Sequence, residues 1–198
     1  MSLTYLIHRS VAMTDIAGYL DGLDHGHRVH EVRALEKKDQ ERLWSLAATA
    51  PPLTLEHFVP ADVPALREVI HHGKNSLPVF TEFQKRMCRP ADGEGRLFGY
   101  NEGITRPLLG PGCFVVHPTA DTPSWGPRGA MVVDYWMVPD GPVDPRWPKV
   151  VGNHVGLQRL VYHQTRDFMR GVSAHVSIGK AWKKEKAMPA YFVLCRED

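Results

Sequence analysis

Three polar side chains alternate along a predicted C-terminal strand, and they are the first candidates for chemistry. Ser173, His175 and Ser177 are spaced two residues apart, so an extended strand would place them on one face of a sheet. Hydroxyl groups beside an imidazole can hold its tautomer and relay a proton. On a face that lines a pocket, His175 would be the candidate base. On a solvated face, the same small polar residues need no function.

A second set of polar residues has the spacing of a single helix face. His163, Arg166, Asp167 and Arg170 follow an i, i+3, i+4, i+7 pattern. In that arrangement Asp167 would orient His163 as a catalytic base, and the arginines would receive a carboxylate or a phosphate. The pattern is equally typical of a solvated helix face with weak ion pairs.

The segment His71–Ser76 precedes a predicted helix and could hold an anion. The N-terminus of a helix offers free N–H groups, and His72, Lys74 and Ser76 would supply polar contacts beside it. The segment lacks the Gly-x-x-x-x-Gly-Lys spacing of a phosphate-binding loop. Ser76 is also explained by a purely structural role, as the cap of that helix.

Three histidines fall within six residues near the N-terminus. His25, His27 and His30 could bind zinc or copper, provided that further ligands come from elsewhere in the fold. The surrounding Asp24-His25-Gly26-His27 resembles a flexible turn. The sequence leaves open whether these residues bind a metal, and it identifies no cofactor.

A basic segment beside Trp182 has two interpretations. Lysines next to an indole could contact a nucleic-acid backbone and stack on a base, and Trp182-Lys183-Lys184-Glu185-Lys186 has that composition. The same residues fit the exposed turn of a hairpin. The chain has 24 basic and 22 acidic residues, a net charge of only +2, so we expect a turn and no nucleic-acid partner.

The overall composition is that of a soluble globular protein. Of 198 residues, 43% are hydrophobic and 23% charged, which excludes a disordered or collagen-like chain. Cys88, Cys113 and Cys195 are far apart and form no Cys-x-x-Cys pair, so a disulfide framework is not expected and a cytoplasmic location is. No apolar segment approaches the length of a membrane span, so no membrane partner is expected either.

The elements that must position these residues differ between the two parts of the chain. Residues 1–90 are predicted to be rich in helices, and residues 91–198 rich in strands with one inserted helix. In the first part we expect a strand over 29–35, a helix over 37–48, a strand over 53–59 and a helix over 76–88. In the second part we expect strands over 113–117, 130–138, 172–182 and 190–196, with a helix over 154–170 after Asn153.

These elements predict an α+β fold formed by residues 1–198 as a single domain. A curved antiparallel β-sheet would occupy the C-terminal two-thirds of the chain, with helices packed on one face. The last two strands would pair as a hairpin across a short connection. Sheets of this kind often enclose a ligand pocket between the concave face and the covering helix.

Two functions of different classes are favoured, and a third, a metal-dependent enzyme, would be tested by elemental analysis of the purified protein. In the first, the protein binds a small molecule in a pocket with an apolar aromatic lining, and His117, His175 and the segment 72–76 supply the polar contacts. The aromatic residues of the lining would be Tyr100, Phe114, Tyr135, Trp136 and Phe192. Any chemistry would be proton transfer by a histidine. In the second, tryptophans in proline-rich loops, such as Trp125 and Trp147, present a surface to a partner protein or to a second copy of the chain. The position of the tryptophans discriminates between the two.

Overall fold

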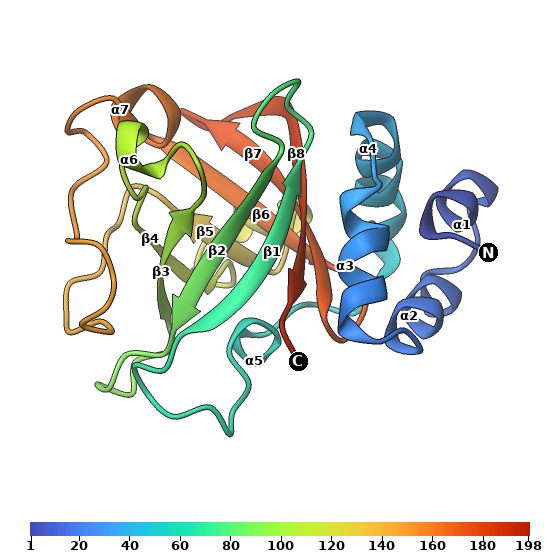
Figure 1. Cartoon of the computed structure of the whole chain (residues 1–198), viewed down its shortest axis with the longest axis horizontal. Helices are drawn as coiled ribbons and strands as arrows, with labels where there is room; N and C mark the ends of the chain where they lie inside the picture. The colour runs from blue at the N-terminus through green and yellow to red at the C-terminus, as the bar shows by residue number, and fades with distance from the viewer.

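An eight-stranded antiparallel barrel forms the centre of the structure, a computed structural model that describes residues 1–198 (Figure 1). Each strand pairs with the next one along the chain, and the last strand pairs with the first. The strands are β1 (Val69–Asn75), β2 (Glu82–Cys88), β3 (Leu97–Glu102), β4 (Phe114–Pro118), β5 (Met131–Asp134), β6 (Thr165–Gly171), β7 (Val176–Lys183) and β8 (Lys186–Arg196).

The closure of the sheet corrects the expected open, curved sheet, although the antiparallel α+β class is confirmed. β1 pairs with β2 on one side and with β8 on the other, in a register that runs from His71 opposite Arg196 to Asn75 opposite Phe192. A closed sheet leaves no unpaired edge. Barrels of eight strands have an interior that side chains can fill or that can hold one small ligand.

Four helices form a layer on the outside of the barrel, on the right in Figure 1. They are α1 (Leu3–Arg9), α2 (Met13–Asp21), α3 (His25–Arg33) and α4 (Lys37–Leu46), the last followed by a 3-10 turn, η1 (Ala47–Thr49). Their apolar faces, with Leu3, Ile16 and Leu43, share one buried core with Val176 and Ile178 of β7. The prediction of helices packed on one face of a sheet is confirmed in this form.

Short helices lie near the two ends of the barrel (Figure 1). They are α5 (Leu55–Phe58), α6 (Arg106–Leu109) and α7 (Gln158–Val161). The 3-10 turn η2 (Pro123–Arg128) follows β4, and its Trp125 packs against Phe168 of β6. α5 closes one end, because Phe58 is fully buried in the same core as Met87 and Leu194. The Nε2–H of His71 donates to the backbone oxygen of Phe58 at 2.9 Å, and burial lowers the pKa of His71 to about 3.

The predicted helix over 76–88 is wrong. Residues 76–81 form the β1–β2 connection, and β2 follows. Leu77 and Phe80 have the spacing of one helix face, but they lie in this connection and are 53% and 64% exposed. Phe80 also has φ +51°, which a helix cannot contain. The apolar residues that the prediction grouped at helical spacing therefore belong to two different local structures.

The predicted helix over 154–170 is also wrong. Only Gln158–Val161 is helical, and its apolar residues are exposed, with Leu160 at 70%. Gln164 turns the chain at φ +58°, and β6 then begins at Thr165. Along β6 the side chains alternate, so that Asp167 faces the barrel interior while Phe168 faces the helical layer.

Three further boundaries differ from expectation. Residues 29–35 lie largely in α3, where the Asp24 side chain accepts from the backbone N–H of His27 and so caps the helix. Residues 53–59 contain α5 in place of a strand. Residues 172–175 form the β6–β7 connection, so the strand predicted over 172–182 begins only at Val176. The predicted helix over 37–48 and the β7–β8 hairpin are confirmed.

The structure contains no helix whose length and hydropathy would let it cross a membrane.

Candidate functional site

Glycines on the inner wall of the barrel make room for aromatic rings. Three pairs of residues lie directly opposite each other on neighbouring strands: Gly73–Phe83, Gly99–Phe114 and Gly179–Phe192. A Cβ atom added at Gly179 would lie 2.2 Å from the Phe192 ring, and one at Gly99 would lie equally close to the ring opposite. Each ring therefore lies over a residue that has no side chain, as in other sheets where an aromatic residue covers a glycine.

These three rings and Tyr135 surround the ammonium group of Lys85. The Nζ atom lies 4.9 Å from the centre of the Phe114 ring and 5.0 Å from that of Phe192. The rings of Phe83 and Tyr135 are 5.6 and 5.0 Å away. Aromatic faces at these distances attract a cation, and the attraction is stronger where water is excluded. The inner wall is therefore shaped around one lysine.

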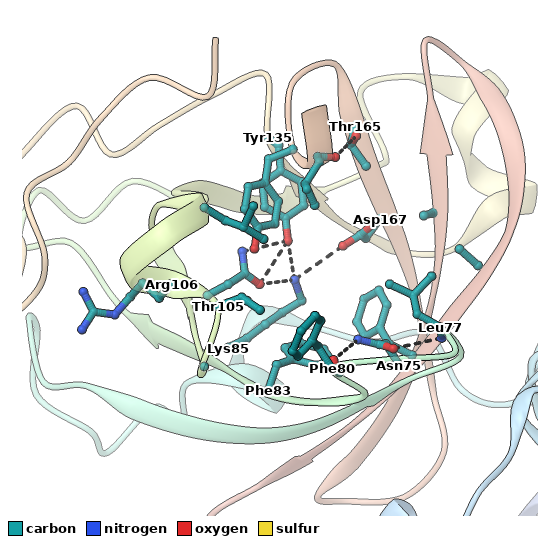
Figure 2. A pocket seen from close by; sticks show the side chains of 18 of the residues that line it. Asn75, Leu77, Phe80, Phe83, Lys85, Thr105, Arg106, Tyr135, Thr165 and Asp167 are labelled. Atoms are coloured by element: carbon teal, nitrogen blue, oxygen red, sulfur yellow. Dashed lines mark hydrogen bonds and ion pairs between the residues drawn. The ribbon is translucent and has the colours of Figure 1, made fainter. Parts of the chain in front are cut away.

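Polar groups complete the surroundings of Lys85 (Figure 2). Its Nζ donates to the Asn101 Oδ1 at 3.0 Å and to the Tyr135 hydroxyl at 2.5 Å, and it faces the Asp167 Oδ2 at 3.5 Å. Lys85 is only 2% exposed. Burial lowers its pKa to about 8, and the nearby Asp167 carboxylate opposes this shift.

The two acidic neighbours of Lys85 are both harder to ionise than usual. Burial raises the pKa of Asp167, although the Lys85 ammonium works in the opposite direction. Burial, together with the charge of Asp167, raises the pKa of Tyr135 well above its ordinary value, so the phenol stays protonated. The cluster thus contains one amine that is easier to deprotonate than usual and one phenol that retains its proton.

A cavity of about 460 Å³ lies against this cluster. Lys85, Asn101, Tyr135 and Asp167 line it together with mainly apolar residues. Side chains of the β1–β2 connection and of α7 line it as well, and several are also exposed: Leu77, Val79, Phe80, Leu160 and Val161. A mainly apolar cavity with a few convergent polar groups and shifted pKa values is the usual form of a small-molecule site.

Three of the residues predicted from sequence line the cavity: Tyr135, Asp167 and Phe192. Tyr135 was predicted as apolar lining, and its hydroxyl is also part of the polar cluster. Asp167 was predicted to orient His163, but its neighbour is Lys85. His163 does not line the cavity; it follows α7 and lies near Trp136, at 6.5 Å between ring centres.

The predicted serine–histidine face is divided between two places. Ser173 and His175 lie in the β6–β7 connection, where the Nδ1 of His175 pairs with Asp198 at 3.0 Å. Ser177 is on β7 and fully buried, with no hydrogen-bond partner for its Oγ. Ser173 borders a second hollow, of about 590 Å³, beside α5. None of the three lines the cavity at Lys85.

The segment His71–Ser76, predicted to bind an anion, does not precede a helix. Its first five residues lie on β1, and Ser76 follows the end of that strand. His72 pairs with Glu197 at 2.8 Å, and the Lys74 ammonium donates to the Thr81 hydroxyl at 3.0 Å. The Ser76 Oγ accepts from the backbone N–H of Tyr191 at 2.9 Å. These three side chains therefore have local partners and do not line the cavity.

The remaining predicted contacts lie outside the cavity too. His117, on β4, lies 3.6 Å from the Asp134 carboxylate, and this neighbour raises the pKa of the histidine. Trp136 is 48% exposed, whereas Trp147 is buried against Tyr100. Trp125 packs edge-on against Phe168 at 5.5 Å.

Sequence reasoning missed Lys85 and Asn101, and with them the polar cluster. The signal was present in β2, where Phe83, Lys85 and Met87 alternate and therefore share one face of a strand. A lysine between two apolar residues on one strand face is a candidate for a buried charge. The helix predicted over 76–88 has a different periodicity, so this alternation was missed.

Comparisons of the chain with protein families, with curated proteins and with solved structures find no match.

Proposed function

We propose that the barrel binds one small, mainly apolar and uncharged molecule, with a carbonyl or hydroxyl group directed to Lys85. The observation that carries this proposal is the cavity of about 460 Å³, mainly apolar, with the buried polar cluster of Lys85 at its wall. Apolar walls favour an apolar ligand, and a few fixed polar groups give it one orientation. Exposed apolar side chains such as Phe80 and Leu160 line the same cavity and would contact the apolar part of such a ligand as it enters.

The charges at the cluster favour a neutral head group. The Lys85 ammonium and the Asp167 carboxylate lie 3.5 Å apart, so their charges largely cancel. A carboxylate ligand would be attracted by Lys85 but repelled by Asp167. A ligand carbonyl could accept from Lys85 or Tyr135, and a ligand hydroxyl could also donate to Asp167.

Blocking the cavity tests the proposal. The neutral fluorescent dye Nile red should bind with increased emission, and the change Ala181→Trp should abolish binding because Ala181 lines the cavity. Ala187→Trp is the matched control, since Ala187 is exposed on the neighbouring strand β8. Equal binding by wild type and Ala181→Trp would contradict the proposal.

Competition between ligands of equal chain length tests the head group. Decanol should displace the dye more effectively than decane, because only the alcohol satisfies the cluster at Lys85. Decanoate should be weaker than decanol because of Asp167. Displacement that is strongest with decanoate would show that the site selects anions.

A second candidate function is covalent chemistry at Lys85, favoured by the pKa of about 8 of this amine. About one amine in ten is then uncharged at pH 7, whereas an ordinary lysine is almost wholly protonated. An uncharged buried lysine can act as a nucleophile toward a carbonyl group. No histidine lines the cavity, so this candidate places the chemistry on the lysine.

The reaction would convert a ligand aldehyde or ketone into an imine. The Lys85 nitrogen adds to the carbonyl carbon, a proton moves from nitrogen to oxygen, and the carbinolamine then loses water. The Tyr135 hydroxyl, 2.5 Å from the lysine Nζ, is placed to donate a proton to the departing hydroxyl group. The products are one imine and one water, so no oxidant or other reactant is required.

Reductive trapping tests the second candidate. Decanal with cyanoborohydride at pH 7 should label Lys85 before the exposed lysines, as located by mass spectrometry of peptides. Lys85→Met should remove this fast label and should still bind Nile red, which separates chemistry from binding. Labelling that favours exposed lysines over Lys85 would exclude the imine and leave the binding function standing.

We also propose a reducing compartment as the site of action. The three cysteines are unpaired and buried, which supports the expectation from their spacing.

A further inference from the structure

Two histidines and a glutamate from distant parts of the chain meet outside the barrel. His25 begins α3, His72 lies on β1, and Glu197 follows β8. Each offers one ligand atom, and the three atoms lie within 4.8 Å of one another. The imidazole rings are 5.5 Å apart between centres. This cluster shares no residue with the cavity at Lys85.

We propose that His25, His72 and Glu197 form a binding site for a divalent transition-metal ion, with zinc as the reference ion. Two imidazole nitrogens and one carboxylate oxygen are ligands that zinc accepts, and they leave a fourth position for water. Soft thiolate ligands are absent from the set, so copper(I) is not favoured.

The positions of the three side chains are held by the fold. The backbone N–H of Glu197 donates to the Ile70 oxygen at 2.9 Å, which extends the β1–β8 pairing past the end of β8. His72 lies opposite Cys195 in that pairing. His25 occupies the first turn of a helix that Asp24 caps. A metal would therefore bridge the helical layer and the two strands that close the barrel.

Neither imidazole ring of the cluster has all of its hydrogen-bonding capacity satisfied by the protein. The Nδ1 atoms of His25 and His72 are buried and have no hydrogen-bond partner, and a buried polar atom without a partner costs free energy. The Nε2 of His72 already lies 2.8 Å from the Glu197 carboxylate. Ligand atoms around tetrahedral zinc are about 3.3 Å apart, so small side-chain shifts would suffice.

The neighbouring charges are compatible with a bound cation. Arg28 lies on the same helix, but its guanidinium donates to the Asp198 carboxylate at 2.6 Å and to two backbone oxygens. Asp198 also pairs with His175. The positive charge of Arg28 is thus compensated by groups that the metal does not need.

The structure also shows which of His25, His27 and His30 has other metal-ligating side chains beside it, which the sequence left open. His27 is exposed and pairs with Asp24 at 2.6 Å, and His30 is exposed as well. Only His25 of the three belongs to the cluster. His27→Ala is therefore a control that removes a nearby histidine without removing a ligand.

Calorimetric titration of the chelator-treated full chain with Zn²⁺ tests the site. The wild type and His27→Ala should each show one tight site, and His25→Ala and His72→Ala should bind at least about tenfold more weakly. Glu197→Gln, near the exposed chain end, should also weaken binding with little effect on folding. Co²⁺ should give the intense visible bands of tetrahedral coordination in the wild type and lose them in His72→Ala. Absence of a stoichiometric tight site, or equal losses in His25→Ala and His27→Ala, would overturn the proposal.

Discussion

The Nζ of Lys85 and the Oδ2 of Asp167 lie 3.5 Å apart across the interior of the barrel. They belong to β2 and β6, which are not neighbours in the sheet, so no backbone hydrogen bond holds them together. Each is almost completely buried. The charge of each residue is therefore compensated mainly by the other, and changing one should shift the pKa of its partner.

Asp167→Asn should lower the pKa of Lys85 below about 8. Burial already depresses this pKa, and the Asp167 carboxylate is the group that raises it. NMR titration of the lysine Cε resonance measures the value directly. Asp140→Asn, at an exposed carboxylate that pairs with Arg96, should leave it unchanged. An unaltered pKa in Asp167→Asn would show that the pair is not coupled.

Lys85→Met should change how stability depends on pH. Between the folded pKa of about 8 and the unfolded value near 10.4, the unfolded chain holds a proton that the folded chain has lost. Stability from this group therefore rises with pH in that window, by up to about 3 kcal/mol. Other groups titrate there too, so the measurement is the difference in urea unfolding between wild type and variant. A flat difference curve would contradict the depressed pKa.

Gly179→Ala should destabilise the protein by about 1–3 kcal/mol, because the new methyl group meets the Phe192 ring. Gly18→Ala is the control. Gly18 lies within α2 with no atom near the added methyl, so that change should stabilise by about 0.5–1 kcal/mol. Thermal or urea unfolding distinguishes the two signs, and a neutral Gly179→Ala would mean that the ring moves without cost.

Asp134→Asn should lower the pKa of His117 toward its ordinary value. The Asp134 carboxylate is the main cause of the raised pKa. In the wild type the pair contributes stability below about pH 6.5 that is lost as the pH rises through the folded pKa of the histidine. An NMR titration of the imidazole protons reports the shift, and identical curves for both proteins would rule out the interaction.

The sequence correctly predicted the elements that depend only on residues close together in the chain. Residues 113–117 form a nearly continuous apolar run and are β4, and the short connection before residue 190 predicted the β7–β8 hairpin. The helix at 37–48 has helix-forming composition throughout. In each case neighbouring residues determine the structure, so a short window of sequence suffices.

The closure of the barrel and the site inside it depend on residues far apart in sequence. β1 pairs with β8 across more than a hundred residues, and no short pattern records such a pairing. Leu77, Phe80 and Met87 have helical spacing, but Leu77 and Phe80 lie in the β1–β2 connection and Met87 lies on β2. Lys85 is recognisable as a buried charge only when residues 82–88 are treated as a strand, in which it shares a face with Phe83 and Met87.

The pairing of β8 with β1 has a consequence for folding during synthesis. The chain is synthesised from its N-terminus, so β1 can pair with β2 early but can pair with β8 only after residues 192–196 have left the ribosome. Such distant pairing is slow to form. A nascent or prematurely terminated chain that lacks these last residues would leave β1 with an unpaired edge, and it is this species that a chaperone would need to protect.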